Sequence, residues 1–232
     1  MKEKTINSVG ELHDLAASFT QSHPIFRGVS DESYELLTRF SRSIINNKKL
    51  REKASTFSYI VDSAKEKAAL SDFRNRSTPY LAFDPVNEWE WLAIAQHHGL
   101  PTRMMDWTTN PLVAAYFATT HNPSHSDSAI YVIVEQYKLG RAPLNQSPFD
   151  IEAPIVFHPR HTTPRITAQS GLFTVHAELE QPFNCEGLEK WVIKKECRIE
   201  IEIMLSLYGI EPASMFPGLD GIAASIVKDF GL

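Results

Sequence analysis

Side chains able to do chemistry are densest in the run from Gln96 to Pro111, whose sequence is QHHGLPTRMMDWTTNP. The run mixes imidazole, guanidinium, carboxylate, indole, hydroxyl and carboxamide groups. Its polar and apolar residues follow neither a helical nor a strand period, and Gly99 and Pro101 interrupt it. Because functional residues concentrate on loops that a rigid scaffold holds, the run is predicted to be a loop that forms part of a binding or catalytic site.

The two histidines of this run, His97 and His98, are adjacent, so on a helix their side chains point about 100° apart. They are not placed to share one metal ion, and no Cys or carboxylate stands beside them at ligand spacing, so no metal is expected. We expect His97 to hydrogen-bond a ribose or a backbone carbonyl. We expect His98 to be a half-buried structural histidine at a helix end.

Arg103 and Asp106 lie three residues apart, which leaves two interpretations. They form a local ion pair that shapes the turn, or Arg103 contacts a substrate that Asp106 helps to orient. The structural interpretation is favoured for Asp106. Asn110, directly before Pro111, is the better cap for the helix that follows, which leaves the hydroxyl of Thr108 for the site.

Arg27 lies in the middle of the apolar segment 25–29. A guanidinium in an apolar strand is costly unless it is paired. Arg27 therefore either forms a salt bridge with an acid such as Asp106 or binds a phosphate through two parallel hydrogen bonds.

Hydrophobic periodicity predicts the elements that position these residues. Helices are expected over 6–22, 31–45, 48–74, 86–98, 195–208 and 219–230 and from Pro111 onward, and strands over 25–29, 129–134, 171–176 and 191–193. Ser8 and Glu11 have the spacing of a capping box for the first helix. Residues 195–208 also alternate like a strand, but the helix is favoured. Together the elements predict one α+β domain over residues 1–232, with a helical N-terminal half packed on a small, split antiparallel or mixed sheet.

The composition limits the classes of function. The chain has 232 residues, of which 43% are hydrophobic and 22% charged, as in ordinary globular proteins with a sizeable core. A net charge of -5 argues against a protein that mainly grips duplex nucleic acid by its phosphates, although a local basic groove is compatible with it. Cys185 and Cys197 have neither zinc nor redox spacing. Since no signal peptide and no apolar run of membrane-spanning length is recognised, we expect a cytoplasmic protein with no membrane partner.

A series of motifs along the chain resembles the FRG domain family of bacteria and phages. The motifs are Phe26-Arg27-Gly28, Gln96 to Arg103 followed by Asp106-Trp107-Thr108, Arg165-Ile166 with Gln169, and Phe216 to Gly221. The resemblance extends from about residue 25 to residue 225. It implies a role in conflict between host and phage, as a toxin or a phage-defence effector.

The order of these motifs is also similar to the ADP-ribosyltransferase fold of the arginine–serine–glutamate type. In that fold an aromatic-Arg-Gly strand holds NAD through its Arg, a Ser-Thr-Ser strand precedes an Ala-x-x-Phe-Ala helix, and a last strand carries the catalytic Glu. The matching parts, in order, are Phe26-Arg27-Gly28, Trp107-Thr108-Thr109 before Ala115 to Ala118, and Gln169. The resemblance implies NAD as substrate. It implies catalytic roles for Arg27, Thr108 and Gln169 and ligand contacts for Gly28, His97, Arg103, Asp106, Trp107 and Thr109.

Gln169 departs from that pattern, because the resemblance predicts a Glu at its position. Cleavage of the nicotinamide–ribose bond passes through an oxocarbenium-like state, which an ionised carboxylate stabilises. Gln forms hydrogen bonds but carries no charge. Activity is therefore reduced, or another acid (Glu178, Glu180 or Asp106) supplies the charge, or the site binds without catalysis. A further interpretation is that Gln169 simply ties a loop.

Two functions of different kinds follow from these residues. The first is an enzyme that transfers ADP-ribose from NAD to a macromolecular acceptor, protein or nucleic acid, or that hydrolyses NAD. The second is a non-catalytic module that binds a nucleotide or a nucleic acid. Both predict that Arg27, Thr108 and Gln169 meet at one cleft.

Overall fold

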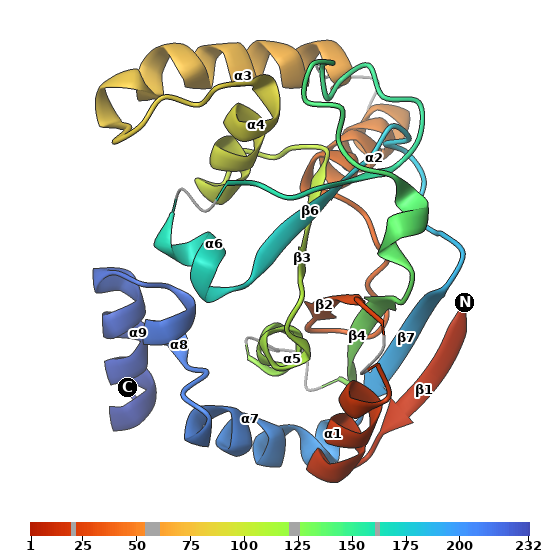
Figure 1. The fold of residues 1–232 in the computed structure, drawn as a ribbon, viewed down its shortest axis with the longest axis vertical. Coiled ribbons are helices and arrows are strands. Elements are labelled where there is room, and N and C mark those ends of the chain that lie inside the picture. The colour runs from red at the N-terminus through yellow and green to blue at the C-terminus, as the bar shows by residue number, and fades with distance from the viewer. Residues whose placement is uncertain (20–21, 54–60, 121–125, 161–162) are drawn as a thin grey trace.

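The structure of the chain is a computed structural model that describes residues 1–19, 22–53, 61–120, 126–160 and 163–232. Its strands form one mixed seven-stranded sheet in the order β1-β7-β4-β2-β3-β6-β5 within these residues (Figure 1). The strands are β1 (Lys2–Ile6), β2 (Ile25–Val29), β3 (Met104–Thr108), β4 (Ser128–Ile133), β5 (Ile155–Phe157), β6 (Gly171–Val175) and β7 (Leu188–Ile193). β1 runs parallel to β7, and the other neighbours are antiparallel.

The sheet opens between β2 and β3. Of the described residues in these two strands, Phe26 and Thr108 are the one pair in register, whereas β2 pairs with β4 along its whole length and β3 does so with β6. Beyond Phe26 the two strands diverge, and the Nη1 atom of Arg27 donates to the carbonyl oxygen of Asp106 at 2.7 Å. A side chain thus bridges the two strands where backbone pairing stops.

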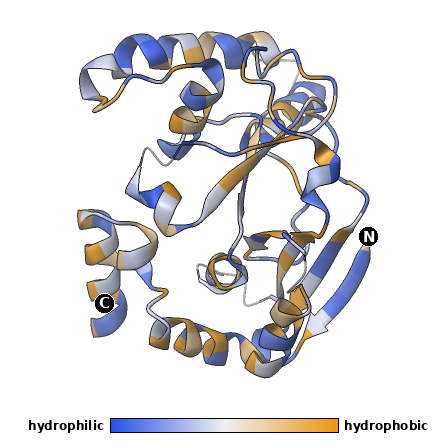
Figure 2. Cartoon of the chain, viewed as in Figure 1, coloured by the Kyte–Doolittle hydropathy of each residue, from blue (hydrophilic) through white to orange (hydrophobic). Residues whose placement is uncertain are grey.

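The helices surround this sheet. They are α1 (Val9–Ala17), α2 (Arg39–Lys53), α3 (Ser63–Ser77), α4 (Glu88–His97), α5 (Pro111–Thr119), α6 (Pro164–Ala168), α7 (Arg198–Leu207), α8 (Pro212–Met215) and α9 (Leu219–Phe230), with short 3-10 turns η1 (Thr78–Tyr80), η2 (Gln136–Leu139) and η3 (Lys195–Cys197). Figure 1 shows α3 and α4 at one end of the molecule and α1 and α7 at the other, with α5 between them. The outer helix α3 is largely hydrophilic (Figure 2).

Helix α5 lies against the centre of the sheet and fixes β2. A Cβ atom at Gly28 would lie 1.9 Å from the carbonyl oxygen of Ala114, so the strand reaches this helix only because residue 28 has no side chain. α1 and α7 complete this core with Leu12 and Ile201, and α3 and α4 form a second core near β5 that includes Trp89. Val113, Ala114 and Phe117 of this helix also border a cavity beside the sheet.

The boundaries of the first three predicted helices are wrong. The segment 6–22 contains the end of β1 and the shorter α1, although Ser8 caps it as predicted, accepting from the backbone N–H of Glu11 at 3.2 Å. The helix predicted over 31–45 begins only at Arg39, because the side chain of Asp31 holds a turn by accepting from Ser33. The helix predicted over 48–74 is divided: α2 ends at Lys53, α3 begins after Asp62, and residues 54–60 lie outside the described residues.

The predicted loop between residues 98 and 110 also needs correction, because it contains β3. Asp106 and Thr109 are exposed in the run 104–109 while the other residues are buried, so it does not alternate as a half-buried strand would. Gln169 is not in a strand either, but is the C-cap residue of α6. The connection before α6 contains the short strand β5, which no sequence pattern indicated.

Other elements lie where they were predicted. Residues 25–29 are β2, Asn110 caps α5 by accepting from the N–H of Leu112 at 2.9 Å, and residues 198–207 are helical. The α+β class is confirmed, but the N-terminal half also supplies β1, β2 and β3 to the sheet. Across the described part of the chain, no helix combines the length and the apolar character that crossing a membrane requires.

Candidate functional site

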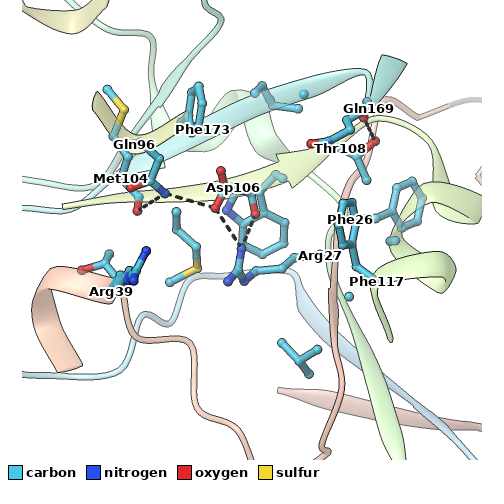
Figure 3. Close-up of a pocket in the computed structure, with 18 of the residues that line it drawn as sticks. Phe26, Arg27, Arg39, Gln96, Met104, Asp106, Thr108, Phe117, Gln169 and Phe173 are labelled. Atoms are coloured by element: carbon cyan, nitrogen blue, oxygen red, sulfur yellow. Dashed lines mark hydrogen bonds and ion pairs between the residues drawn. The ribbon is translucent and has the colours of Figure 1, made fainter. Parts of the chain in front are cut away.

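A cavity of about 960 Å³ opens where β2 and β3 separate. Residues of β2, β3, β6, α2, α4, α5 and α6 line it, and Arg27, Thr108 and Gln169 are all among them. The predicted convergence of these three residues on one cleft is therefore confirmed. Figure 3 shows Arg39 at one end of the cavity and Phe117 at the other, with Asp106 between them.

The centre of the pocket holds an ion pair between Arg27 and Asp106. Arg27 Nη1 lies 3.7 Å from Asp106 Oδ2, and the side chains are 22% and 62% exposed. Burial lowers the pKa of Arg27, and the neighbouring Asp106 opposes that shift. The salt bridge considered for Arg27 is thus present, and the exposed carboxylate of Asp106 still faces the cavity.

Gln96 fixes the position of Asp106. Its amide nitrogen donates to Asp106 Oδ2 at 3.1 Å and to the carbonyl oxygen of Met104 at 3.2 Å (Figure 3). Its Oε1 atom accepts from the hydroxyl of Thr102 at 2.6 Å. Gln96 belongs to the central motif, but no role was predicted for it, because its contact with Asp106, ten residues away, depends on how β3 lies against α4.

Thr108 and Gln169 each have structural partners. The hydroxyl of Thr108 donates to the backbone carbonyl of Gln169 at 2.7 Å and accepts from the N–H of Asn110 at 3.0 Å. The side-chain nitrogen of Gln169 donates to the carbonyl oxygen of Met215 at 2.9 Å. The loop tie that was one interpretation of Gln169 is therefore observed, linking α6 to α8.

His97 lines the cavity as a neutral imidazole. Burial lowers its pKa to about 4, with Arg165 and His98 contributing in the same direction. It can therefore donate or accept one hydrogen bond at neutral pH without adding charge. His98 is exposed rather than half-buried and is not part of the cavity wall.

Trp107 belongs to the wall of the cavity but is only 3% exposed. Its indole N–H donates to the hydroxyl of Thr174 at 2.8 Å, and that hydroxyl lies 2.8 Å from His176 Nε2. The indole N–H of Trp107 is thus directed into the protein rather than toward a ligand.

Two residues predicted to contact a ligand lie outside the cavity wall. Arg103 is 2% exposed and pairs with Glu66 at 2.9 Å rather than with Asp106. Thr109 is exposed, and its backbone N–H bonds to Ser170. Gly28 does line the cavity, but its lack of a side chain is explained by the packing against α5.

Three arginines that line the pocket were not predicted as site residues: Arg39, Arg42 and Arg165. Burial lowers the pKa of Arg42, and the charge of Arg39 adds to this effect; burial also lowers the pKa of Arg165. Arg165 stands in a family motif, but Arg39 and Arg42 begin an otherwise ordinary polar helix, so their position carried no signal.

Acidic residues are fewer than arginines on the wall of this cavity. Within the described residues, the carboxylates lining it are those of Glu35 and Asp106. Of the three acids considered as substitutes at position 169, Asp106 lies in the pocket. Glu180 instead pairs with Lys48 at 2.8 Å, and Glu178 is exposed elsewhere. No group of His, Cys, Asp or Glu suited to hold a metal ion occurs in the described part of the chain.

The FRG domain family matches residues 22–127. This segment includes β2, α2, β3 and α5, and hence Arg27, Asp106 and Thr108, whereas the motifs around Gln169 and Phe216 lie beyond it. No curated protein and no solved structure matches the chain significantly. Residues 22–127 therefore match the FRG domain family, as the motifs within this segment predicted.

Proposed function

We propose that the pocket between β2 and β3 binds NAD and that the protein cleaves the nicotinamide–ribose bond, either hydrolysing NAD or transferring ADP-ribose to a protein or nucleic acid. The observation that carries the proposal is the meeting of Arg27, Thr108 and Gln169 at one cavity of about 960 Å³. That volume lies in the usual range of small-molecule and cofactor sites.

The charge of the pocket supports an anionic ligand. Four arginines line it, and Arg27 has Asp106 as an ion-pair partner. Guanidinium groups bind phosphate oxygens through paired, charge-assisted hydrogen bonds. A dinucleotide with two phosphates would supply the negative charge that the wall of the cavity lacks.

Asp106 is the carboxylate that we assign to the reaction. In the proposed step the bond between ribose C1′ and the nicotinamide nitrogen breaks, and its electron pair leaves with neutral nicotinamide. An oxygen of water or of the acceptor then bonds to C1′ and releases its proton. The carboxylate stabilises the positive charge that develops on the ribose. The amide of Gln96 holds Asp106 in a fixed orientation for this role.

Incubation with NAD labelled in both halves tests the proposal. We expect nicotinamide release, together with labelled ADP-ribose free in solution or attached to a lysate component. Asp106→Asn should lower the rate about 10²–10³-fold, the range found when one transition-state-stabilising group is removed. Asp72→Asn, which changes an exposed acid that pairs with Arg76 on α3, is the matched control and should leave the rate unchanged. Intact NAD after long incubation with the wild-type chain would refute the enzymatic function.

A second candidate, nucleotide binding without turnover, is favoured by a specific observation. Gln169 has no charge and uses its amide to hold Met215, and Arg27 partly neutralises Asp106. In that case calorimetry would detect NAD binding while all NAD is recovered intact. The same pair of measurements therefore separates the two functions.

The role in host–phage conflict implied by the family resemblance remains a proposal. Expression of an NAD-consuming protein should arrest growth and lower cellular NAD, and Asp106→Asn should relieve both effects. Normal growth of cells that express the wild-type chain at high level would count against a toxin.

A further inference from the structure

Three pocket arginines form no salt bridge with an acid among the residues that the structure describes. Arg39 and Arg42 lie at the start of α2, and Arg165 lies in α6. Within the described part of the chain, no carboxylate lies within 4.0 Å of the guanidinium nitrogens of these three residues, whereas Arg27 has Asp106. Asp106 acts on Arg42 and Arg165 only at longer range, and the four arginines of the cavity wall outnumber its two carboxylates, Glu35 and Asp106.

Neutral groups hold each of these guanidiniums in place. Arg39 Nη1 donates to the carbonyl oxygen of Gly99 at 2.9 Å, and Arg42 Nη1 donates to that of Leu37 at 2.8 Å. The guanidinium carbon of Arg165 lies 4.7 Å from the centre of the Phe216 ring. A guanidinium has five N–H donors, so one such contact orients the group while leaving donors for a ligand.

Collecting these charges in one pocket is electrostatically unfavourable for the protein alone. Burial lowers the pKa of Arg42, and the charge of Arg39 adds to this effect; burial also lowers the pKa of Arg165, and in both cases Asp106 opposes the shift. A ligand with two adjacent negative groups would relieve this repulsion and fill several guanidinium donors together. A single carboxylate would fill one guanidinium and leave the others uncompensated.

We propose that Arg39, Arg42 and Arg165 form a subsite that binds a diphosphate, and that this subsite holds the two phosphates of the dinucleotide. This inference rests on the proposed function in one respect only, the identity of the complete ligand. The subsite itself requires a diphosphate and no reaction. Asp106 lies between Arg39 and Phe117 in the cavity (Figure 3), so a ligand that extends from this subsite passes the carboxylate.

Calorimetric titration with ADP, inorganic pyrophosphate and adenosine tests the subsite. We expect ADP and pyrophosphate to bind the wild-type chain and adenosine to bind much more weakly. Arg39→Gln, Arg42→Gln and Arg165→Gln should each weaken ADP and pyrophosphate at least tenfold. Arg42→Lys keeps the charge but loses the planar pair of donors, so it should lie between Arg42→Gln and the wild type. Arg51→Gln changes an exposed arginine later in α2 and outside the cavity, and should leave both affinities unchanged.

The outcomes separate this inference from the proposed function. Thermal melts confirm first that each variant is folded. Equal affinity of ADP for the wild type and the three Gln variants overturns the subsite, even if NAD is cleaved. Arginine-dependent binding of ADP and pyrophosphate with no binding or cleavage of NAD supports the subsite and overturns the proposed function. If neither ADP nor pyrophosphate binds the wild-type chain, the subsite is overturned as well.

Discussion

The buried ion pair between Arg103 and Glu66 allows a test of whether Arg103 serves the stability of the fold rather than the binding of a ligand. The two side chains are 2% and 1% exposed, and Arg103 Nε lies 2.9 Å from Glu66 Oε2. Glu66 Oε1 also accepts from the backbone N–H of Arg103 at 2.6 Å. Burial raises the pKa of Glu66 even though Arg103 opposes that shift. The pair connects α3 to the residue before β3, behind the cavity rather than in it.

Arg103→Met removes the guanidinium but keeps an apolar side chain in its place. It leaves a buried carboxylate without its counter-charge, and breaking such a pair costs about 3–5 kcal/mol of unfolding free energy. In the variant the pKa of Glu66 rises further above its unfolded value, so the folded state takes up a proton before the unfolded state does. The loss of stability should therefore be full at pH 8 and shrink as the pH falls toward the ordinary carboxyl range.

Urea unfolding of wild type and variant at pH 8 and pH 5.5, with ADP titration of the folded proteins, measures both effects. We expect a large stability difference at pH 8, a smaller one at pH 5.5, and unchanged ADP affinity. Arg76→Met removes an exposed ion pair with Asp72 and should change stability by no more than about 0.5 kcal/mol. Unaltered stability of Arg103→Met at pH 8, or weaker ADP binding by the folded variant, would refute this reasoning.

Three further changes test the packing and the ties around the pocket. Gly28→Ala places a Cβ atom 1.9 Å from the carbonyl oxygen of Ala114, so it should cost about 3 kcal/mol or more, and a wild-type melting temperature would contradict this. Gln169→Glu sets a carboxylate against the carbonyl oxygen of Met215, which should cost about 1–3 kcal/mol and should not raise the rate of NAD cleavage above that of the wild type. A higher rate would show that the site requires a carboxylate at position 169. Burial lowers the pKa of His176 to about 3, so below pH 6.5 the unfolded state takes up a proton that the folded state does not, and wild-type stability should fall. His176→Gln should lose less stability than the wild type between pH 6.5 and pH 5. Equal losses in the two proteins would contradict a buried, neutral His176.

The elements predicted correctly are those that a short, local pattern of residues determines. β2 is a short apolar run, and α5 follows an Asn-Pro pair that caps and begins it, so their positions were predicted correctly. β1 was missed because its residues are mostly charged, and it is stabilised as an edge strand by pairing with the distant β7. β3 lies in a segment predicted to be a loop, because tertiary burial rather than alternation determines which of its side chains are exposed.

Site residues, too, were predictable where a local motif marks them and not where tertiary contacts place them. The meeting of Arg27, Thr108 and Gln169 at one cavity was predictable because each of these residues stands in a motif. The Arg103–Glu66 pair joins residues 37 positions apart, and Glu66 carried no motif, so the partner of Arg103 was not predictable. Arg39 and Arg42 are likewise placed by tertiary structure, because an arginine on a polar helix has the same sequence context whether it faces solvent or a cavity.

Calorimetric titration of NAD into the wild-type chain and Arg27→Gln tests the binding site most directly. The side chain of Arg27 bridges β2 and β3 where they diverge, and it pairs with Asp106. We therefore predict one NAD bound per wild-type chain and at least tenfold weaker binding by the folded variant. No heat of binding with the wild type, or equal affinity in the two proteins, would contradict a dinucleotide site at this gap in the sheet.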